Sequence, residues 1–441
     1  MKIVNDLGIV DMLKKHLTEA ESMEIIAIAV SKLIRPLPLA SIDTWFEGTS
    51  LSRTMNADLK SQRISDLLDR IGSSDIYRQF SSDLISRINP GNSLLYDITS
   101  LPSHGSANIL EYGHAKDHPE LEQINLGMVM ERSRNIPLFF EIYSGSIPDV
   151  VTLKRTVEGI RKLIPKIEII LDRGFFSHEN LSLLKDDSYI IAASLVPKAL
   201  KNVFYSASRT VDRADNVIMY ENEPIFCKQV SFTMDDLHLK GYFYHDRKRE
   251  ADELSDFHRK LSERRSAVEK LQIRLDVRET IESTASQYLR YFTWRVEDGR
   301  IKTRARDNAI TAAEHRVGRF LLVYNGEYTP LECLSIYRNR DNIEKAFRML
   351  KTDLDIFPMR VWKESTIRGI LLLFFISLII RTALMKGMIS SGLMKKYSLE
   401  KMLLELEKLH VVEDANGSMI EMERTRKQKD ILDALEKVSW W

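Results

Sequence analysis

The chain has 441 residues, and a typical domain length of about 150 residues predicts two or three structural units. Its 64 Lys+Arg against 63 Asp+Glu leave a net charge of +1, which excludes a chain-wide polycation, so a nucleic-acid site would have to be a local patch. The two cysteines, Cys227 and Cys333, are too few for a disulfide framework or a four-cysteine zinc site, which fits a reducing cytoplasm.

The first 90 residues read as helical. Helices are expected over residues 22–33, 61–71 and 74–88. Pro36 and Pro38 stop the first of these, because proline cannot continue a helix. The breaker at 89–91 (Asn-Pro-Gly) marks a boundary, after which the texture changes to strands.

The next hundred residues alternate strands and helices. Three apolar runs (93–99, 123–131 and 136–144) predict an antiparallel meander, followed by a helix over 150–164 and a strand over 167–172. Ser177 can cap a helix over 178–184, and a further strand follows at 189–193. This β-β-β-α-β-α-β order is typical of the ribonuclease-H-like fold, an α/β fold whose first and fourth strands lie side by side.

Residues 200–330 depart from that pattern and read as an insertion. Strand-like pieces (216–221, 225–233 and 239–245) precede a charged stretch, 246–278, which suits a long helix packed along one edge. An apolar residue recurs every seven positions in it, at Leu254, Leu261, Val268 and Leu275. A solvated helix is favoured over a nucleic-acid arm, although Arg264 and Arg265 could touch DNA.

Near the C-terminus a strand is expected at 320–324 and a helix from Pro330. The apolar run 369–380, bounded by Arg368 and Arg381, holds 12 residues, whereas a membrane span needs about 20. We therefore expect a helix buried on all sides rather than a membrane segment.

Four polar residues recur with helical spacing after Pro330. If residues 336–354 form one helix, Arg340, Glu344 and Lys351 fall at roughly −60°, −20° and −40° from Tyr337, a narrow strip beside an apolar face. A carboxylate flanked by cations can bind a divalent ion while the cations hold phosphate oxygens. A surface helix with Glu–Lys pairs also explains the periodicity. By periodicity alone, this second interpretation is favoured.

Two lone acids shift that balance. Asp97 and Asp172 each interrupt an apolar strand, where an acid is costly unless it is paired or binds a metal. Separately they could be an edge-strand residue and a turn cap. On the first and fourth strands of the expected fold they favour a shared site, which with Glu344 would suit two Mg²⁺ ions about 4 Å apart.

The spacing of Tyr337, Arg340, Glu344 and Lys351 resembles the Y-(2)-R-(3)-E-(6)-K signature of the DDE transposases of the insertion-sequence-four class. Short stretches elsewhere are also similar to that class, namely 96–99, 113–118, 123–127 and 172–175. The resemblance covers roughly residues 5 to 435, and the signature is specific because three spacings are met at once.

The resemblance implies a ribonuclease-H-like catalytic core, interrupted by a mostly β insertion and flanked by helical N- and C-terminal regions. The expected domains are a helical region at 1–90 that binds DNA, the core in two parts at 91–199 and 331–389, the insertion at 200–330, and a helical region at 390–441.

The resemblance also implies the chemistry. Asp97, Asp172 and Glu344 would be the catalytic, metal-binding triad, holding two Mg²⁺ ions for which Mn²⁺ may substitute, and Tyr337, Arg340 and Lys351 would bind DNA phosphates. The implied activity is cleavage at transposon ends and transfer of the 3′-hydroxyls into target DNA. It implies double-stranded DNA as the partner and a dimer on paired ends, in the prokaryotic cytoplasm at the nucleoid, with no membrane.

Two other functions stay open at this stage. We expect the chain to begin inside the family pattern, so it could be a shortened, non-catalytic DNA-binding remnant or a regulator of transposition. It could also be an unrelated ribonuclease-H-like nuclease acting on junctions or RNA–DNA hybrids, although the Tyr-Arg-Glu-Lys spacing argues against that.

Overall fold

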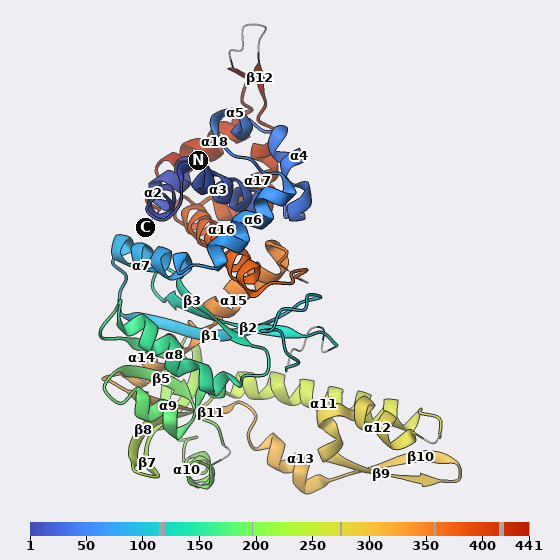
Figure 1. Ribbon diagram of the computed structural model, residues 1–441. Coiled ribbons are helices and arrows are strands. Elements are labelled where there is room, and N and C mark those ends of the chain that lie inside the picture. Colours follow the sequence, from blue (N-terminus) through green and yellow to red (C-terminus); the bar gives the residue numbers. More distant parts are fainter. Residues whose placement is uncertain are drawn as a thin grey trace. The chain divides into compact units, whose positions relative to one another are not determined.

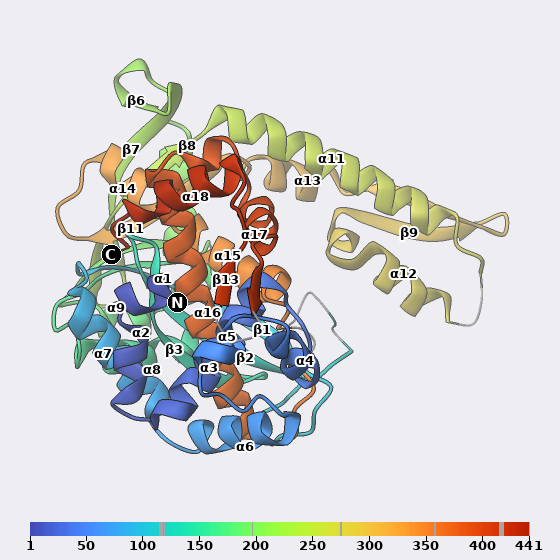
Figure 2. The same ribbon diagram turned by 90° about the horizontal axis from the view of Figure 1, so that it is seen from above.

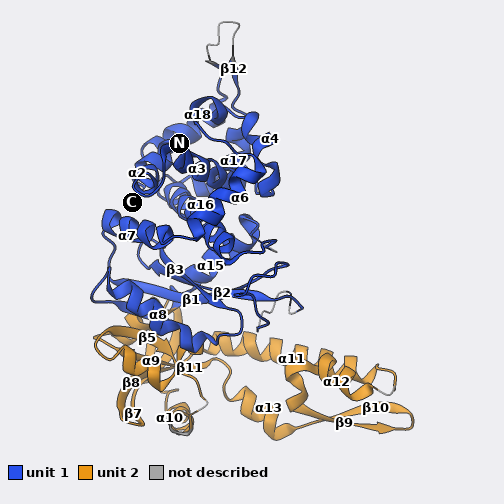
Figure 3. Cartoon of the chain, viewed as in Figure 1, with its two compact units in different colours: residues 1–171, 338–441 blue, residues 172–337 orange. Residues whose placement is uncertain are grey.

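The computed structural model describes residues 1–113, 118, 120–195, 197–273, 276–356, 359–413 and 419–440 (Figure 1). The chain folds into two compact units, which Figure 3 distinguishes by colour. Unit 1 comprises residues 1–171 and 338–441, and unit 2 comprises residues 172–337. Most of the family-like stretch 113–118, and Leu275 of the heptad pattern, lie outside the described residues.

Unit 1 begins with helices, as predicted. They are α1 (Lys2–Asp6), α2 (Ile9–Lys14), α3 (Glu19–Ile34), η1 (Leu39–Ser41), α4 (Ile42–Glu47), α5 (Leu51–Thr54), α6 (Ser61–Gly72) and α7 (Ile76–Ile88). Helix α3 starts earlier than expected because Thr18 and Glu21 form a capping box, in which each side chain accepts a backbone N–H of the other. The left-handed Asn89, with φ of 41°, ends α7.

The sheet of unit 1 confirms the predicted meander. Strands β1 (Ser93–Pro102), β2 (Gln123–Glu131) and β3 (Ile136–Ser144) pair antiparallel in succession. Helix α8 (Asp149–Arg161) then returns the chain to β4 (Glu168–Leu171), which pairs parallel with β1. The strand order in this unit is β3-β2-β1-β4, so β1 has a neighbour on both sides.

Helices cover both faces of this sheet (Figure 1). On one face the buried Tyr96 hydroxyl lies 3.0 Å from the Thr152 hydroxyl of α8. On the other face the Phe140 ring packs 5.0 Å from Phe375 of α16 (Glu364–Ser390), between ring centroids. Alternate strand residues point to opposite faces, so Asp97 lies on the face opposite Tyr96.

Helix α16 is the expected buried helix, but it is longer than the run between the two arginines. It has 27 residues, and 89% of its most apolar window is buried inside the protein. By length and composition alone it could cross a membrane. Arg368 and Arg381 lie within the helix rather than at its ends. Each is neutralised by a carboxylate: Arg368 pairs with Glu364, and Arg381 pairs with Asp353.

Unit 1 closes with short elements after α16. They are η6 (Leu393–Lys395), α17 (Leu399–Glu407), β12 (Val411–Glu413), β13 (Met419–Glu421) and α18 (Arg426–Glu436). The β12–β13 hairpin was not expected from the sequence.

Unit 2 contains a second set of strands, in the order β5-β11-β8-β7-β6, all antiparallel. Its elements outside the arm described next are η2 (Arg173–Phe175), α9 (His178–Leu183), β5 (Ser188–Ala192), α10 (Lys198–Ser208), η3 (Ala214–Asn216), β6 (Val217–Tyr220), β7 (Glu223–Met234), β8 (Leu237–His245), β11 (Arg319–Asn325) and α14 (Pro330–Arg338), which ends just beyond the unit. Ser177 caps α9 as predicted, accepting the Asn180 N–H.

Residues 247–314 of unit 2 form what we call the arm. It contains α11 (Arg247–Glu269), α12 (Val277–Ala285), η4 (Ser286–Tyr291), β9 (Phe292–Glu297), β10 (Arg300–Ala305) and α13 (Asp307–Glu314), and it leads away from the sheet of this unit (Figures 1 and 2). The single helix expected over 246–278 is wrong. The chain turns back after Glu269, and Leu261 and Val268 pack into a small core with Phe292.

Candidate active site

The four signature residues do not lie on one helix, which corrects the sequence interpretation. Helix α14 ends at Arg338, a turn covers Asn339 and Arg340, and α15 (Asp341–Arg348) begins anew. The N–H groups of Asn342 and Ile343 each bond a carbonyl three residues back, at 3.0 Å, which is the geometry of a tight helix start. A π-helical turn, η5 (Met349–Asp353), then follows α15.

Arg340 lies at the break, and its guanidinium joins two carboxylates from different elements. Nη1 lies 3.2 Å from Asp97 Oδ2 on β1, and Nη2 donates to Glu344 Oε1 at 2.5 Å. The Arg340 and Asp97 side chains are 13% and 17% exposed, whereas Glu344 is 49% exposed. Two of the three predicted triad residues are therefore held by one cation at the edge of the buried sheet face.

The neighbouring residues fix Asp97 on this face. Asp97 Oδ1 accepts the Ile98 N–H at 2.9 Å. Ile343, Ala346 and Phe347 are the buried side chains of α15, which packs against β1. Burial raises the pKa of Tyr96 well above its usual value, so its hydroxyl stays protonated and can serve only as a hydrogen-bonding anchor to α8.

Asp172 and Tyr337 are brought together in unit 2, of which they are the first and last residues. The Tyr337 hydroxyl donates to Asp172 Oδ1 at 3.3 Å. The Asp172 carbonyl accepts the Phe175 N–H at 3.1 Å, which starts the 3₁₀ turn after β4. The Tyr337 ring packs against the buried core of this unit, so the hydroxyl is presented from a fixed position.

The register of β1 and β4 relates the two aspartates along the chain. Leu95 pairs with Ile170 in the parallel ladder. Asp97 follows Leu95 by two positions, and Asp172 follows Ile170 by two positions. The spacing along the chain is therefore the same for both acids, although Asp172 follows the last residue of β4 and is the first residue of unit 2.

Lys351 lies on the π turn η5 and is half-buried. The end of that turn is held by Arg381 of α16, whose Nη2 lies 2.5 Å from Asp353 Oδ2 and 2.8 Å from Glu400 Oε1. The hydrogen bond from Arg381 lowers the pKa of Glu400. Sequence reasoning missed this role of Arg381, although a cation that interrupts an apolar run was a signal for it.

Two carboxylates lie together at the candidate site. Among the described residues no group of three His, Cys, Asp or Glu side chains is close enough together to hold a metal ion. Asp97 and Glu344 do supply two carboxylates around a single positive charge, the Arg340 guanidinium. Carboxylate oxygens are the ligands that Mg²⁺ prefers, so these two acids are the candidate metal ligands of unit 1.

Comparisons with known proteins bear on this geometry. The family described as "Transposase DDE domain" matches residues 91–380, a span that includes all six predicted site residues. No curated protein matches the chain. Among solved structures, the chain is similar to the piggyBac transposase in its cryo-EM synaptic complex with hairpin DNA, at 9% identity and a TM-score of 0.39, over 99% of this chain and 77% of that one. Since the family match covers more than half of its length, the chain belongs to the transposases with a DDE domain.

Proposed function

We propose that the protein is a metal-dependent DNA transposase with a ribonuclease-H-like core, in which Asp97, Asp172 and Glu344 are the catalytic carboxylates. The observation that carries the proposal is the Arg340 bridge. It gathers the acid of a central strand and the acid of a separate helix around one positive charge. Acids that serve only as solvated surface charges do not need to share a largely buried cation.

The assignment of Asp172 is supported by two further observations. Asp97 and Asp172 each follow by two positions a residue of the last β1–β4 pair, Leu95 and Ile170. Tyr337, three residues before Arg340, bonds Asp172. These contacts link the signature segment to both aspartates.

The proposed chemistry consists of two phosphoryl transfers. In cleavage, water attacks the phosphorus at the transposon end, the bond from phosphorus to the 3′ oxygen breaks, and a 3′-hydroxyl and a 5′-phosphate result. In strand transfer, that 3′-hydroxyl attacks a target phosphodiester, and a target 3′-hydroxyl leaves. Divalent ions, Mg²⁺ or Mn²⁺, would stabilise the attacking and leaving oxygens when bound.

The residues of this chain would hold and orient the DNA. Tyr337, Arg340 and Lys351 carry the donors for phosphate oxygens near the cut. Arg340 bonds the Asp97 and Glu344 carboxylates, so we propose that it also orients these two acids. The proposal includes the insertion-sequence-four class, a dimer on paired DNA ends, and action at the nucleoid of a prokaryotic cytoplasm.

The test is a cleavage and strand-joining assay on labelled duplexes that carry the element's own ends, taken from DNA flanking the coding region, with Mg²⁺ or Mn²⁺. Glu344→Gln removes the proposed metal-binding carboxylate at nearly constant volume. Asp341→Asn is the matched control, because Asp341 is an exposed acid in the first turn of the same helix.

Metal-dependent cutting that is lost in Glu344→Gln and kept in Asp341→Asn is the expected result. Salt-sensitive DNA binding without cutting in any of the three proteins would refute the enzymatic proposal and point to a non-catalytic DNA-binding protein. A preference for RNA–DNA hybrids over duplex DNA would point to a different nuclease.

A further inference from the structure

The positive charge of the arm is concentrated in one short segment. Residues 290–306 hold six Arg and Lys side chains against two carboxylates, an excess of four in a chain whose net charge is +1. The segment contains β9 and β10, which are joined by Asp298 and Gly299 with φ of 49° and 69°. Two consecutive residues with positive φ make a type I′ turn, the tight connection that fits the twist of a hairpin.

The register of the hairpin sorts its side chains onto two faces. Trp294 pairs with Thr303 and Phe292 with Ala305 on the face toward the arm's core, where Phe292 is fully buried. The opposite face, which we call the outer face, carries the alternate residues. These are Thr293, Arg295, Glu297, Arg300, Lys302 and Arg304. Five of the six side chains are exposed, and Glu297 is half-buried.

Only part of this charge is neutralised within the protein. Glu297 pairs with Arg295 at 2.6 Å and with Lys302 at 3.0 Å. Within the described part of the chain, Arg300 and Arg304 form no ion pair or side-chain hydrogen bond. The outer face thus carries four cations and one carboxylate, and the carboxylate pairs with only two of the cations.

The outer face is held in a fixed orientation by the rest of the arm. Arg265 Nε donates to the Thr303 hydroxyl at 3.0 Å, and Glu269 Oε1 accepts the Thr303 N–H at 3.1 Å. Arg264 donates to the Thr284 carbonyl at 3.0 Å. The two arginines considered as DNA contacts from the sequence are therefore engaged inside the arm, where Arg265 bonds the hairpin and Arg264 bonds α12.

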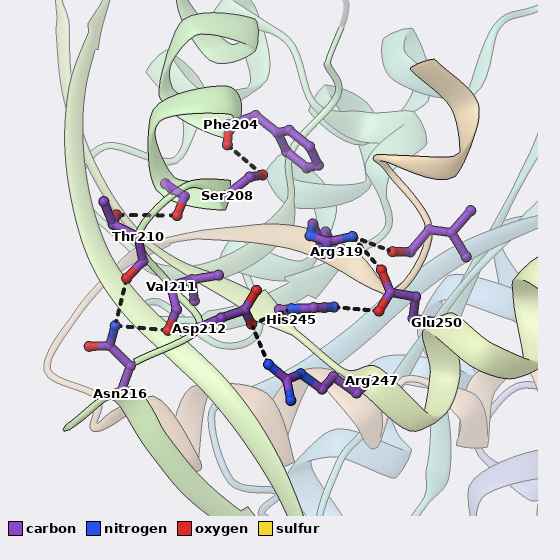
Figure 4. Close-up of polar contacts among 12 residues, drawn as sticks. Phe204, Ser208, Thr210, Val211, Asp212, Asn216, His245, Arg247, Glu250 and Arg319 are labelled. Atoms are coloured by element: carbon purple, nitrogen blue, oxygen red, sulfur yellow. Dashed lines mark hydrogen bonds and ion pairs between the residues drawn. The ribbon is translucent and has the colours of Figure 1, made fainter. Parts of the chain in front are cut away.

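The base of the arm is also fixed, by the polar cluster in Figure 4. The buried His245 ring, at the end of β8, lies 2.5 Å from Asp212 and 2.9 Å from Glu250 in the first turn of α11. Arg319 at the start of β11 donates to Glu250 at 2.5 Å. The first turn of α11 is thereby tied to two strands of the sheet.

We infer that the outer face of the β9–β10 hairpin is a second DNA-binding surface, which contacts the phosphate backbone of duplex DNA through residues other than those of the candidate active site. Alternate strand residues lie about 6.8 Å apart, which gives a row of cations suited to successive phosphates along a strand. A two-stranded ribbon also matches the width of the major groove. Glu297 and Asp298 near the turn repel phosphate, so we expect the face rather than the tip to approach DNA.

This inference rests on the proposed function, because it takes DNA as the partner, but its test does not depend on cleavage. Arg300→Gln/Arg304→Gln removes the two unpaired charges of the outer face. Arg278→Gln/Arg316→Gln is the matched control, since it removes two exposed arginines elsewhere in unit 2. Affinity for a duplex of arbitrary sequence is measured by fluorescence anisotropy over a range of salt concentrations, in chelator, with the full chain.

Each phosphate contact contributes about 0.9 to the slope of log affinity against log salt, so the hairpin variant should lose about 1.8 from the slope. At 0.15 M salt this corresponds to roughly thirtyfold weaker binding, about fivefold per contact, and the control should stay near the unmodified protein. Arg300→Lys/Arg304→Lys should keep the slope, because lysine also neutralises phosphate, and it serves as a check that the hairpin remains folded.

An unchanged slope in the hairpin variant, an equal loss in the control, or no salt-sensitive DNA binding by the unmodified protein would each overturn the inference. The cleavage assay separates this result from the proposed function. If no protein cuts DNA but the slopes differ as expected, the enzymatic proposal fails and the hairpin surface stands. If the unmodified protein cuts and the slopes are equal, the reverse holds.

Discussion

Replacing Arg340 with glutamine tests the central contact of the candidate site. The Arg340 guanidinium neutralises Asp97 at 3.2 Å and Glu344 at 2.5 Å. Glutamine keeps a polar side chain but leaves the two carboxylates without this charge. We therefore expect Arg340→Gln to lose stability in chelator and to regain it when a divalent ion is added.

The size of the effect follows from burial. Removing one partner of a fully buried ion pair costs about 3–5 kcal/mol. Asp97 is 17% exposed and Glu344 is 49% exposed, so water can screen part of the loss, and about 1–2 kcal/mol is the reasonable expectation. For a chain of 441 residues that corresponds to a fall in Tm of about 1–2 °C.

The assay is thermal unfolding in chelator and in millimolar Mg²⁺, with Arg348→Gln as the control. Arg348 is an exposed arginine on the same helix, so its replacement should change Tm little in either condition. Mg²⁺ should raise the Tm of Arg340→Gln more than that of the unmodified protein, because the ion then meets no competing guanidinium. Equal Tm values for the two variants in chelator, or equal responses to Mg²⁺, would refute this account of the site.

Three further predictions concern unit 1. Arg381→Gln should lower the free energy of unfolding by about 2 kcal/mol, because the buried guanidinium holds Asp353 and Glu400. A change in chemical denaturation below experimental error would contradict this. Gly369→Ala should cost about 3 kcal/mol or more, since a Cβ there would collide with the Leu68 backbone, and a variant as stable as the parent would show that α6 and α16 can move apart. The pKa of Glu400 is lowered from its ordinary value of 4.5, so its ionised form stabilises the fold at pH values above 4.5. This stabilisation is lost as the pH falls through the lower pKa of the folded state. Glu400→Gln should therefore flatten the stability profile below pH 4.5 and leave its shape at neutral pH unchanged.

The sheet of unit 1 could be predicted because its strands carry a local signal. The runs that became β2 and β3 are apolar and bounded by turn residues, and both strands have the predicted limits. The parallel neighbour β4 followed from the crossover helix between the strands. The hairpin at 292–305 carried an equally local signal, an alternating strand before Asp298-Gly299, which the sequence analysis did not use.

The break in the signature segment could not be predicted in the same way. No glycine or proline lies between residues 331 and 353, so the local signal favoured one helix. The chain breaks at Arg340, where the guanidinium bonds Asp97, more than 200 residues earlier in the sequence. The spacing predicted Arg340 and Glu344 on one strip of a helix, and the two side chains do bond each other a turn apart. The sequence did not predict the contact with Asp97, because that geometry depends on tertiary structure.

The ends of unit 2 give the site a further property. Asp172 and Tyr337, the residues at which the chain enters and leaves this unit, bond each other at 3.3 Å. The entropic cost of closing a long segment rises only slowly with length, by about 0.6 kcal/mol per doubling. Once its two ends are joined in this way, the segment between them can carry additions such as the arm without moving the residues at its ends. Changes on the outer face of the hairpin, such as Arg300→Gln, should therefore alter DNA affinity while leaving the Asp172–Tyr337 contact intact, so that binding and cutting can be varied separately in one chain.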